Sequence, residues 1–171
     1  MLNTLKTTWG YLLTLLDKHT AFKISGDTLD DIYNYLPISD TLSSSGQPTA
    51  RQFRAIRDAG FTTVVNLLPL GIENALDGEA DLVKSLGMNY IHIPVVFFRP
   101  TDDNFITFAE QMNRLADEKT WVHCAANGRA SAFIYRYRTT VLGEDPEMVK
   151  WDVRESWEPF GVWKTFMSWS H

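Results

Sequence analysis

The most informative stretch of the chain is WVHCAANGRAS, residues 121–131. Its first residues read as the end of a buried strand, and a helix is predicted directly afterwards, over residues 128–141. The first N–H groups of a helix have no partner within the helix, so a loop that opens one attracts anions. The small residues at positions 125, 126, 128 and 130 let the backbone curl closely around such an anion. The stretch therefore predicts an anion-binding loop at the carboxyl end of a strand.

Cys124 and Arg129 are the reactive residues of this loop. The helix dipole and the nearby guanidinium both favour the thiolate form of Cys124, and a thiolate beside an arginine combines a nucleophile with an anion clamp. A lone cysteine is otherwise most often a small buried apolar residue. Because Cys124 is the only cysteine, it forms no disulfide within the chain, and a reducing, cytoplasmic location is expected.

The rest of the chain alternates between strand and helix patterns. Strands are predicted over residues 61–67, 88–96 and 120–123, with an edge strand and turn within 38–47, and helices over 49–59, 73–86 and 102–117. The tail is expected to form two short helices around Pro159. Its four tryptophans are expected to pack the domain. This order predicts a single α/β domain with a central, mostly parallel sheet of four to five strands, flanked by helices. It occupies residues 26–171, and residues 1–25 form an N-terminal extension with an amphipathic helix over 2–17.

Composition narrows the classes of protein further. Of the 171 residues, 44% are hydrophobic, which is enough for a full core and argues against disorder. The net charge of −5 argues against nucleic acid as a partner. No apolar run is long enough for a transmembrane segment, and neither the oligomeric state nor the physiological substrate can be deduced. The four histidines show no metal-ligand spacing and no nucleotide-binding loop occurs, so neither metal nor cofactor is expected.

Several segments together resemble a known family. The His123-Cys124 pair, the loop arginine and Ser131 resemble the signature loop of cysteine-dependent phosphatases, especially the compact dual-specificity kind. Other segments are similar to a bacterial branch that is also found fused to β-lactamase-like hydrolases: SGQPT at 45–49, GFTTVVNL at 60–67 and YIHIPV at 90–95. The resemblance covers about residues 27–142 and implies a cysteine-phosphatase-like fold.

The resemblance also implies a reaction. Cys124 would attack phosphorus to form a cysteinyl phosphate, and Ser131 would assist when water breaks that intermediate. The substrate would be a phosphomonoester, such as phosphotyrosine or a related group, on a phosphorylated protein or a small molecule. Its oxygens would be held by the Arg129 side chain and by the backbone N–H groups of the loop, which are those of Ala125, Ala126, Asn127, Gly128 and Arg129.

The loop departs from the family pattern in its length. Four residues separate Cys124 from Arg129, whereas the family's loop has five, and Ala130 occupies the usual arginine position. One residue at a helix start is a rotation of about 100°, so Arg129 reaches the anion only if the loop is wound differently. A four-residue gap also occurs in rhodanese-type sulfurtransferases, which form a persulfide on cysteine. Two alternatives therefore stay open, a sulfurtransferase and a pseudo-phosphatase that binds phosphorylated partners without turnover.

The general acid is the least defined part of the expected site. Phosphatases of this type carry an aspartate shortly after the Ile-Pro-Val strand, where this chain has Val96, Phe97 and Phe98. The nearest carboxylates are Asp102 and Asp103. Either could protonate the leaving group, or both could simply stabilise the first turn of a helix.

Four further residues have expected supporting or structural roles. His123 is expected to fix the loop by hydrogen bonding and to face away from Cys124. Asn127 either bonds across the loop or adopts a turn conformation, and Gln47 is expected to form a structural turn. Glu79 is expected to be an exposed helix residue.

Overall fold

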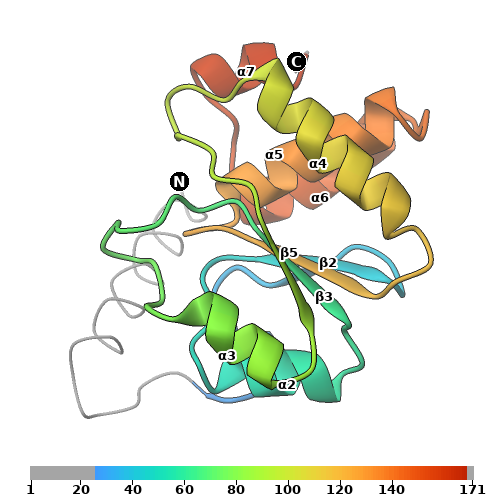
Figure 1. Cartoon of the computed structure of the whole chain (residues 1–171). Helices are drawn as coiled ribbons and strands as arrows, with labels where there is room; N and C mark the ends of the chain where they lie inside the picture. The colour runs from blue at the N-terminus through green and yellow to red at the C-terminus, as the bar shows by residue number, and fades with distance from the viewer. Residues whose placement is uncertain (1–25, 169–171) are drawn as a thin grey trace.

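The computed structural model describes residues 26–168, in which a central sheet lies between two layers of helices (Figure 1). The strands are β1 (Leu36–Pro37), β2 (Leu42–Ser45), β3 (Thr63–Asn66), β4 (Asn89–His92) and β5 (Thr120–His123). Their order is β1-β2-β5-β3-β4, and only β1 runs antiparallel to its neighbour. The predicted α/β fold with a mostly parallel sheet is confirmed. The helix predicted over residues 2–17 lies outside the described residues.

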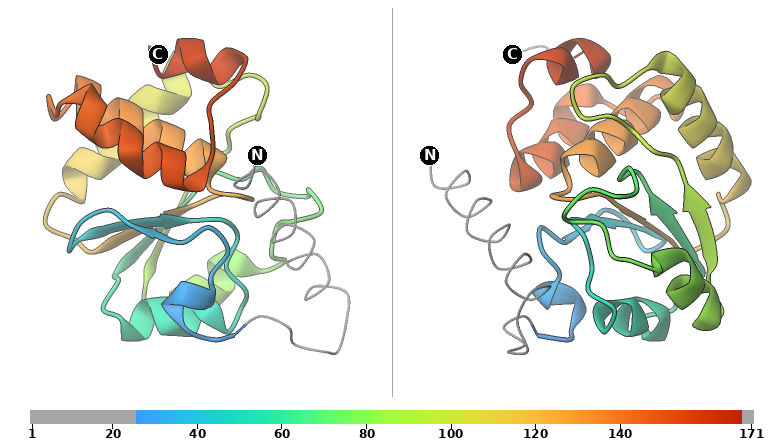
Figure 2. Two further views of the ribbon diagram at one scale, coloured as in Figure 1. Left: turned by 180° about the vertical axis from the view of Figure 1, so that it is seen from behind. Right: turned by 60° about the vertical axis from the view of Figure 1, so that its left-hand side comes forward.

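The helices divide between the two faces of the sheet, as Figures 1 and 2 show. One face carries α2 (Gln52–Asp58) and α3 (Glu79–Ser85), with the short 3-10 helix η1 (Leu29–Asp31) nearby. The other face carries the larger layer, formed by α4 (Asp102–Arg114), α5 (Gly128–Thr140), α6 (Pro146–Ser156) and α7 (Val162–Phe166). Each layer buries its own apolar cluster against the sheet.

Several elements are shorter than predicted, and α3 and β4 differ most. Helix α3 begins at Glu79 and not near residue 73, because Gly78 adopts a left-handed conformation with φ of +70°, which interrupts a helix. Strand β4 ends at His92, two residues before Pro94, which has no N–H to donate to a sheet. The predicted cap of α4 is confirmed, since Thr101 Oγ1 accepts a hydrogen bond from the backbone of Asn104 at 3.1 Å.

Strand β5 carries the loop into the centre of the molecule. It is flanked by β2 and β3, so its carboxyl end opens in the middle of the sheet edge. Side chains alternate along it: Trp121 belongs to the cluster under α2 and α3, and Val122 and Cys124 belong to the cluster under α4 to α7. His123 packs edge-on against Phe53 of α2 and therefore faces away from Cys124, as predicted.

Candidate active site

The carbonyl groups of the Cys124 loop point outward and accept hydrogen bonds from neighbouring segments. Ala125 O accepts a hydrogen bond from the backbone of Gln47 at 3.1 Å, and Ala126 O accepts one from Asn34 Nδ2 at 3.0 Å. Gly46 passes so close that a Cβ there would lie 2.9 Å from Ala125 O. Because C=O and N–H point in opposite directions in a trans peptide, the outward carbonyl of Ala125 turns the N–H of Ala126 towards the inside of the loop.

Asn127 makes the turn that joins the loop to α5. It is fully buried and has a left-handed backbone, with φ of +67°. Its Nδ2 donates to the carbonyl of Asn34 at 2.8 Å, and Asn34 Nδ2 in turn donates to the carbonyl of Ala126 in the loop. Of the two roles considered for Asn127, the turn conformation is present, whereas its side chain bonds to Asn34 outside the loop and not across the loop. The turn leaves the first N–H groups of α5, from Gly128 onwards, without acceptors inside the helix.

Arg129 reaches the site despite the shortened loop. Its side chain is buried, donates from Nε to the carbonyl of Val95 at 2.9 Å, and stacks over the ring of Phe97 with Cζ 5.1 Å from the ring centroid. Arg129 and Cys124 line the same pocket. The structure thus brings a thiol and a guanidinium together at the start of α5, with the guanidinium oriented by the segment that follows β4 and by an aromatic ring of that segment.

Aromatic residues form the walls of this pocket, whose volume is about 260 Å³. Phe97 follows β4, and Trp157 and Phe160 come from the segment between α6 and α7. The ring of Trp157 would lie only 3.5 Å from a Cβ placed at Gly128, so the small residue there lets the ring close over the loop. The other residues that line the pocket belong to the loop: Cys124, Ala125, Ala126, Gly128 and Arg129.

The expected role of the tail tryptophans needs correction. Trp163 is fully buried and packs the domain. Trp157 also packs against the same cluster but lines the pocket as well, and Trp151 is 64% exposed. Trp169 lies outside the described residues. Sequence reasoning missed Trp157 because its position depends on how α6 packs against α5, and a single tryptophan after a helix carries no signal of that packing.

Ser131 is connected to the loop and not to the thiol. Its hydroxyl donates to the carbonyl of Asn127 at 2.7 Å and accepts a hydrogen bond from Trp157 Nε1 at 2.9 Å. The hydroxyl therefore ties the aromatic wall to the left-handed turn. Among the hydrogen bonds of residues 26–168, Ser131 makes none to Cys124.

Asp102 and Asp103 are not brought into the pocket. Both lie in the first turn of α4, where they are exposed, and Asp102 forms an ion pair with Arg136 at 2.8 Å. Asp102 lines a separate surface hollow with Arg99 and Arg136. No carboxylate of residues 26–168 lines the Cys124 pocket.

A buried carboxylate that sequence reasoning missed lies behind the loop. Glu79, expected to be exposed, is only 3% exposed and contacts His123 with 2.9 Å between its Oε1 and Nε2 of the ring. Gln47 Nε2 donates to Glu79 Oε2 at 2.5 Å, so the predicted turn residue also belongs to this buried cluster. The first position of α3 is typical of a surface acid, and burial there depends on contacts between distant segments.

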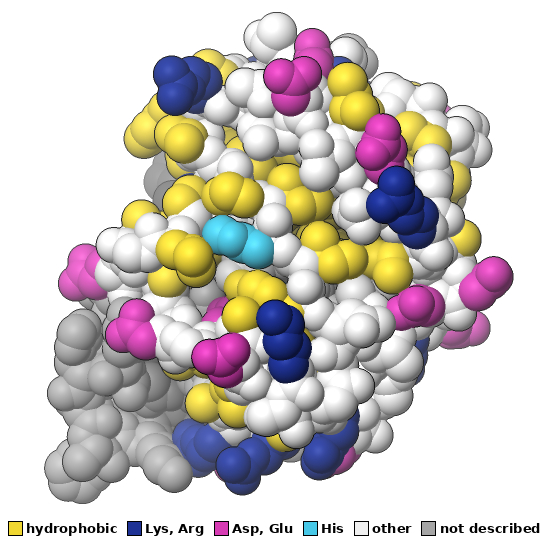
Figure 3. Space-filling model, viewed as in Figure 1, with side chains coloured by type: hydrophobic (Ala, Val, Ile, Leu, Met, Phe, Trp, Pro, Cys, Tyr) yellow, Lys and Arg dark blue, Asp and Glu magenta, His cyan; other side chains and the backbone are white. Residues whose placement is uncertain are grey.

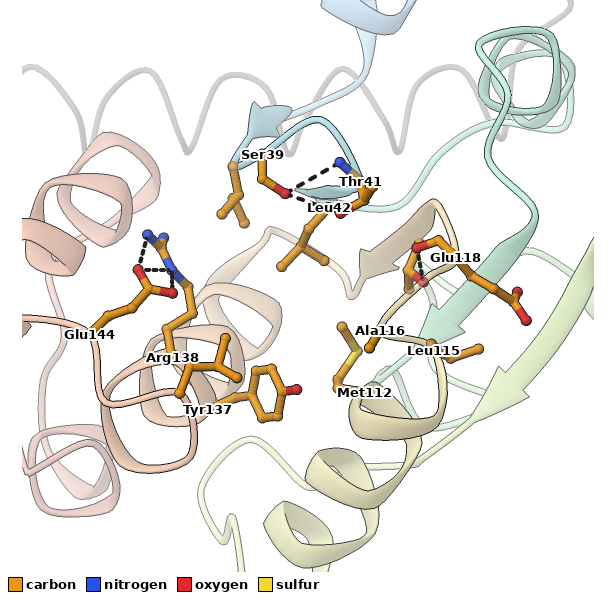
Figure 4. A pocket seen from close by; sticks show the side chains of 13 residues that line it. Ser39, Thr41, Leu42, Met112, Leu115, Ala116, Glu118, Tyr137, Arg138 and Glu144 are labelled. Carbon is orange, nitrogen blue, oxygen red and sulfur yellow. Dashed lines mark hydrogen bonds and ion pairs between the residues drawn. The ribbon is translucent and has the colours of Figure 1, made fainter.

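The remaining surface shows fewer features of this kind. A cavity of about 340 Å³ lies near the start of β5, at the opposite end of that strand from Cys124, beside the ion pair of Arg138 and Glu144 (Figure 4). On the face in Figure 3, the described residues show charges of both signs interspersed with apolar groups, without a broad basic patch.

Residues 26–168 contain no cluster of three metal-binding side chains. Within that same range, no helix has the length and apolar character to cross a membrane.

Comparison with known proteins places the chain in a family. The model of the DSP-PTPase phosphatase domain fused to NAD+ kinase matches residues 37–158, so the chain belongs to this family of cysteine-dependent phosphatases. A DUF442 protein of Shewanella putrefaciens CN-32, described as a phosphatase, is 31% identical with a TM-score of 0.75, over 82% of this chain and 92% of that one. No curated protein matches the sequence.

More distant structures share the fold. TpbA of P. aeruginosa is 18% identical with a TM-score of 0.61, over 81% of this chain and 86% of that one. The core catalytic domain of the PP-IP phosphatase SIW14 of S. cerevisiae is 12% identical with a TM-score of 0.67, over 82% and 86% of the two chains. The predicted resemblance to cysteine-dependent phosphatases is confirmed.

Proposed function

We propose that this protein hydrolyses phosphomonoesters through a cysteinyl-phosphate intermediate on Cys124. The observation that carries the proposal is the shared pocket of Cys124 and Arg129 at the start of α5. A helix start and a guanidinium together favour both the thiolate and the phosphoryl oxygens. The domain that performs this reaction is proposed to span residues 26–171, with residues 1–25 as an extension. Because a working thiolate must stay reduced, we propose a cytoplasmic location.

The reaction has two steps. The Cys124 sulfur attacks phosphorus, an S–P bond forms, and the P–O bond to the leaving group breaks with its electron pair staying on that oxygen. The backbone N–H groups of Ala125, Ala126, Asn127, Gly128 and Arg129, with the Arg129 guanidinium, hold the equatorial oxygens. Water then attacks phosphorus, the S–P bond breaks, and inorganic phosphate and the thiolate are released. No metal or cofactor takes part in this scheme.

The contacts of Ser131 support an indirect role in this scheme. Its hydroxyl holds the Asn127 turn and the Trp157 ring, so it acts on the thiolate through the shape of the loop. Asp102 or Asp103 would serve as general acid only after leaving the first turn of α4, and Asp102 would also have to leave Arg136. The leaving group is therefore proposed to depart without a strong proton donor.

The aromatic walls support an aryl phosphate, such as phosphotyrosine, as the substrate. Phe97, Trp157 and Phe160 offer ring faces and edges on which a phenyl group can pack. TpbA of P. aeruginosa, which shares the fold, has been crystallised in complex with phosphotyrosine as a variant with serine in place of a cysteine. A phosphorylated protein or a small aryl phosphate is accordingly the proposed partner of the pocket.

The deciding experiment compares the wild type with Cys124→Ser on an aryl phosphate. We expect the variant to lose turnover while it keeps the fold and still binds inorganic phosphate, because the loop N–H groups and Arg129 remain. Hydrolysis by the variant at a rate near that of the wild type would overturn the mechanism.

The four-residue gap between Cys124 and Arg129 favours a sulfurtransferase as the second candidate. The wild type is therefore also assayed for sulfur transfer from thiosulfate to cyanide. Sulfur transfer without phosphate release would replace the phosphatase proposal, and phosphate binding without either reaction would identify a pseudo-phosphatase.

A further inference from the structure

Glu79 lies in a place where an isolated carboxylate would be strongly unfavourable. Its side chain is 2% exposed, and the imidazole it contacts is fully buried. Transfer of a charge into a protein interior costs several kcal/mol, of the order of 5, unless hydrogen bonds and an opposite charge compensate. The structure supplies three donors: His123 Nε2 at 2.9 Å, Asn66 Nδ2 at 2.8 Å and Gln47 Nε2 at 2.5 Å.

These three donors come from the three chain segments that support the Cys124 loop from behind. His123 directly precedes Cys124 on β5. Gln47 follows β2, and its backbone N–H donates a hydrogen bond to the outward carbonyl of Ala125, a residue of the loop. Asn66 ends β3, and its Oδ1 accepts a hydrogen bond from the backbone of Leu68 at 2.7 Å. One carboxylate thus joins the ends of β5, β2 and β3 at the edge of the sheet where the loop opens.

The electrostatics of this cluster favour an ionised Glu79. Burial by itself would raise the pKa of Glu79, but the attraction of His123 and the hydrogen bonds from His123 and Gln47 outweigh it, so the pKa is lowered. Two causes raise the pKa of Tyr90: burial, which is the larger, and the negative charge of Glu79. Tyr90 therefore stays neutral. His123 and Tyr90 are the titratable side chains that act on Glu79 here. The ionised carboxylate thus holds the side chain that directly precedes Cys124 on β5.

We propose that Glu79 is the positioning residue of the Cys124 loop: its carboxylate fixes His123 and Gln47 so that the loop keeps the shape that binds an anion and favours the thiolate. Glu79 does not touch the Cys124 pocket and acts only through these two neighbours. The proposal rests on the proposed function only in assuming that the loop binds an anion.

The test uses Glu79→Gln, Glu79→Asp and the matched control Asp81→Asn, which removes the same charge from an exposed position in the first turn of the same helix. Three quantities are measured for each folded variant: the free energy of unfolding in urea, the affinity for inorganic phosphate, and the rate at which iodoacetate labels Cys124 across about pH 5 to pH 8. Labelling reports the thiolate without any turnover, so it decides on Glu79 even if the protein proves not to be a phosphatase.

We expect Glu79→Gln to lose about tenfold or more in phosphate affinity, since small displacements of a binding group have effects of this size. Its labelling profile should shift to higher pH, whereas Glu79→Asp should recover part of both losses and Asp81→Asn should match the wild type. A folded Glu79→Gln variant that loses only stability, with phosphate affinity and labelling within about twofold of the wild type, would overturn the proposal.

A second variant keeps the test decisive if Glu79→Gln does not fold. Gln47→Met removes the Nε2 donor to Glu79 but keeps the length of the side chain and the backbone bond to Ala125. We expect about a threefold loss of phosphate affinity, because one of the two connections between Glu79 and the loop is lost. An unchanged affinity and an unchanged labelling profile would also overturn the proposal.

Discussion

The guanidinium of Arg129 is oriented by two contacts. Its Nε donates to Val95 O at 2.9 Å, and its Cζ lies over the ring of Phe97, 5.1 Å from the centroid. A lysine offers a point charge without the planar fork. We therefore expect Arg129→Lys to weaken phosphate binding by about tenfold or more and to reduce turnover on an aryl phosphate at least as much.

Titration with phosphate and steady-state kinetics measure these two effects. Arg99→Lys serves as the control, because Arg99 is exposed and does not line the Cys124 pocket. Equal phosphate affinity of Arg129→Lys and wild type would show that the fork is not used and would favour binding by backbone N–H groups alone.

Single residues differ in how far their roles could be predicted from the sequence. Cys124 and Arg129 were predictable because both lie in one short loop at a strand-to-helix junction, where local chemistry determines their role. Glu79 was not predictable, since it meets His123 across 44 positions of the chain, and Gly78 and Asp81, one residue before it and two residues after it, are exposed. Burial of a carboxylate is a property of the tertiary structure and leaves no pattern in the adjacent residues.

The segment between β4 and α4 is where the absence of a proton donor would have its effect. It places Phe97 against Arg129 and leaves Asp102 paired with Arg136 at the helix start. A positioned general acid contributes about 10²- to 10⁴-fold to such a reaction. Without one, departure of the leaving group must depend on the stability of the free oxyanion.

We therefore expect turnover to fall steeply as the pKa of the leaving alcohol or phenol rises, so that activated aryl phosphates react and alkyl phosphates hardly do. Asp102→Asn and Asp103→Asn should each lose less than about tenfold, well below the contribution of a general acid. Rates for a series of aryl phosphates, with pH–rate profiles for both variants, test this expectation. If either variant lost about a hundredfold in turnover and its pH–rate profile also lost the basic limb, that residue would be the general acid.

Elements were predictable where periodicity and caps act locally, and less so where packing decides. Strand β5 and the start of α5 occur as predicted, and Thr101 caps α4. The segment after α6 was not predicted to line the pocket, because its position follows from the packing of α6 on α5, where Arg138 of α5 binds Asp152 of α6. That contact joins residues 14 positions apart on separate helices, which no local pattern records.

The site joins both layers of the molecule. Its aromatic walls come from the layer of α4 to α7, whereas the Glu79 cluster behind it lies on the face of α2 and α3. The loop of Cys124 is the connection between the two, because β5 sends His123 to one side and Cys124 to the other. A change in either layer is therefore expected to reach the anion-binding loop.

The stability of the whole domain should depend on pH through Glu79. The pKa of this carboxyl is lower in the folded protein than its ordinary value of 4.5, so its ionised form stabilises the fold above that value. The stabilisation is lost as the pH falls below 4.5 and through the lower pKa of the folded state. Glu79→Gln removes this titration and leaves at least one buried donor without its acceptor, which costs about 1–3 kcal/mol near neutral pH.

We expect the difference in unfolding free energy between the wild type and Glu79→Gln to be largest near neutral pH and to narrow as the pH falls through the acidic range. Urea unfolding at a series of pH values measures this difference. The other acidic residues are the same in both proteins, so their contributions to the pH dependence cancel. Asp81→Asn is the control, and its difference from the wild type should stay small, since an exposed charge contributes little to stability. A difference for Glu79→Gln that is the same at neutral and acidic pH would show that Glu79 is not ionised in the folded protein, and the attraction between its carboxylate and His123 would then be absent.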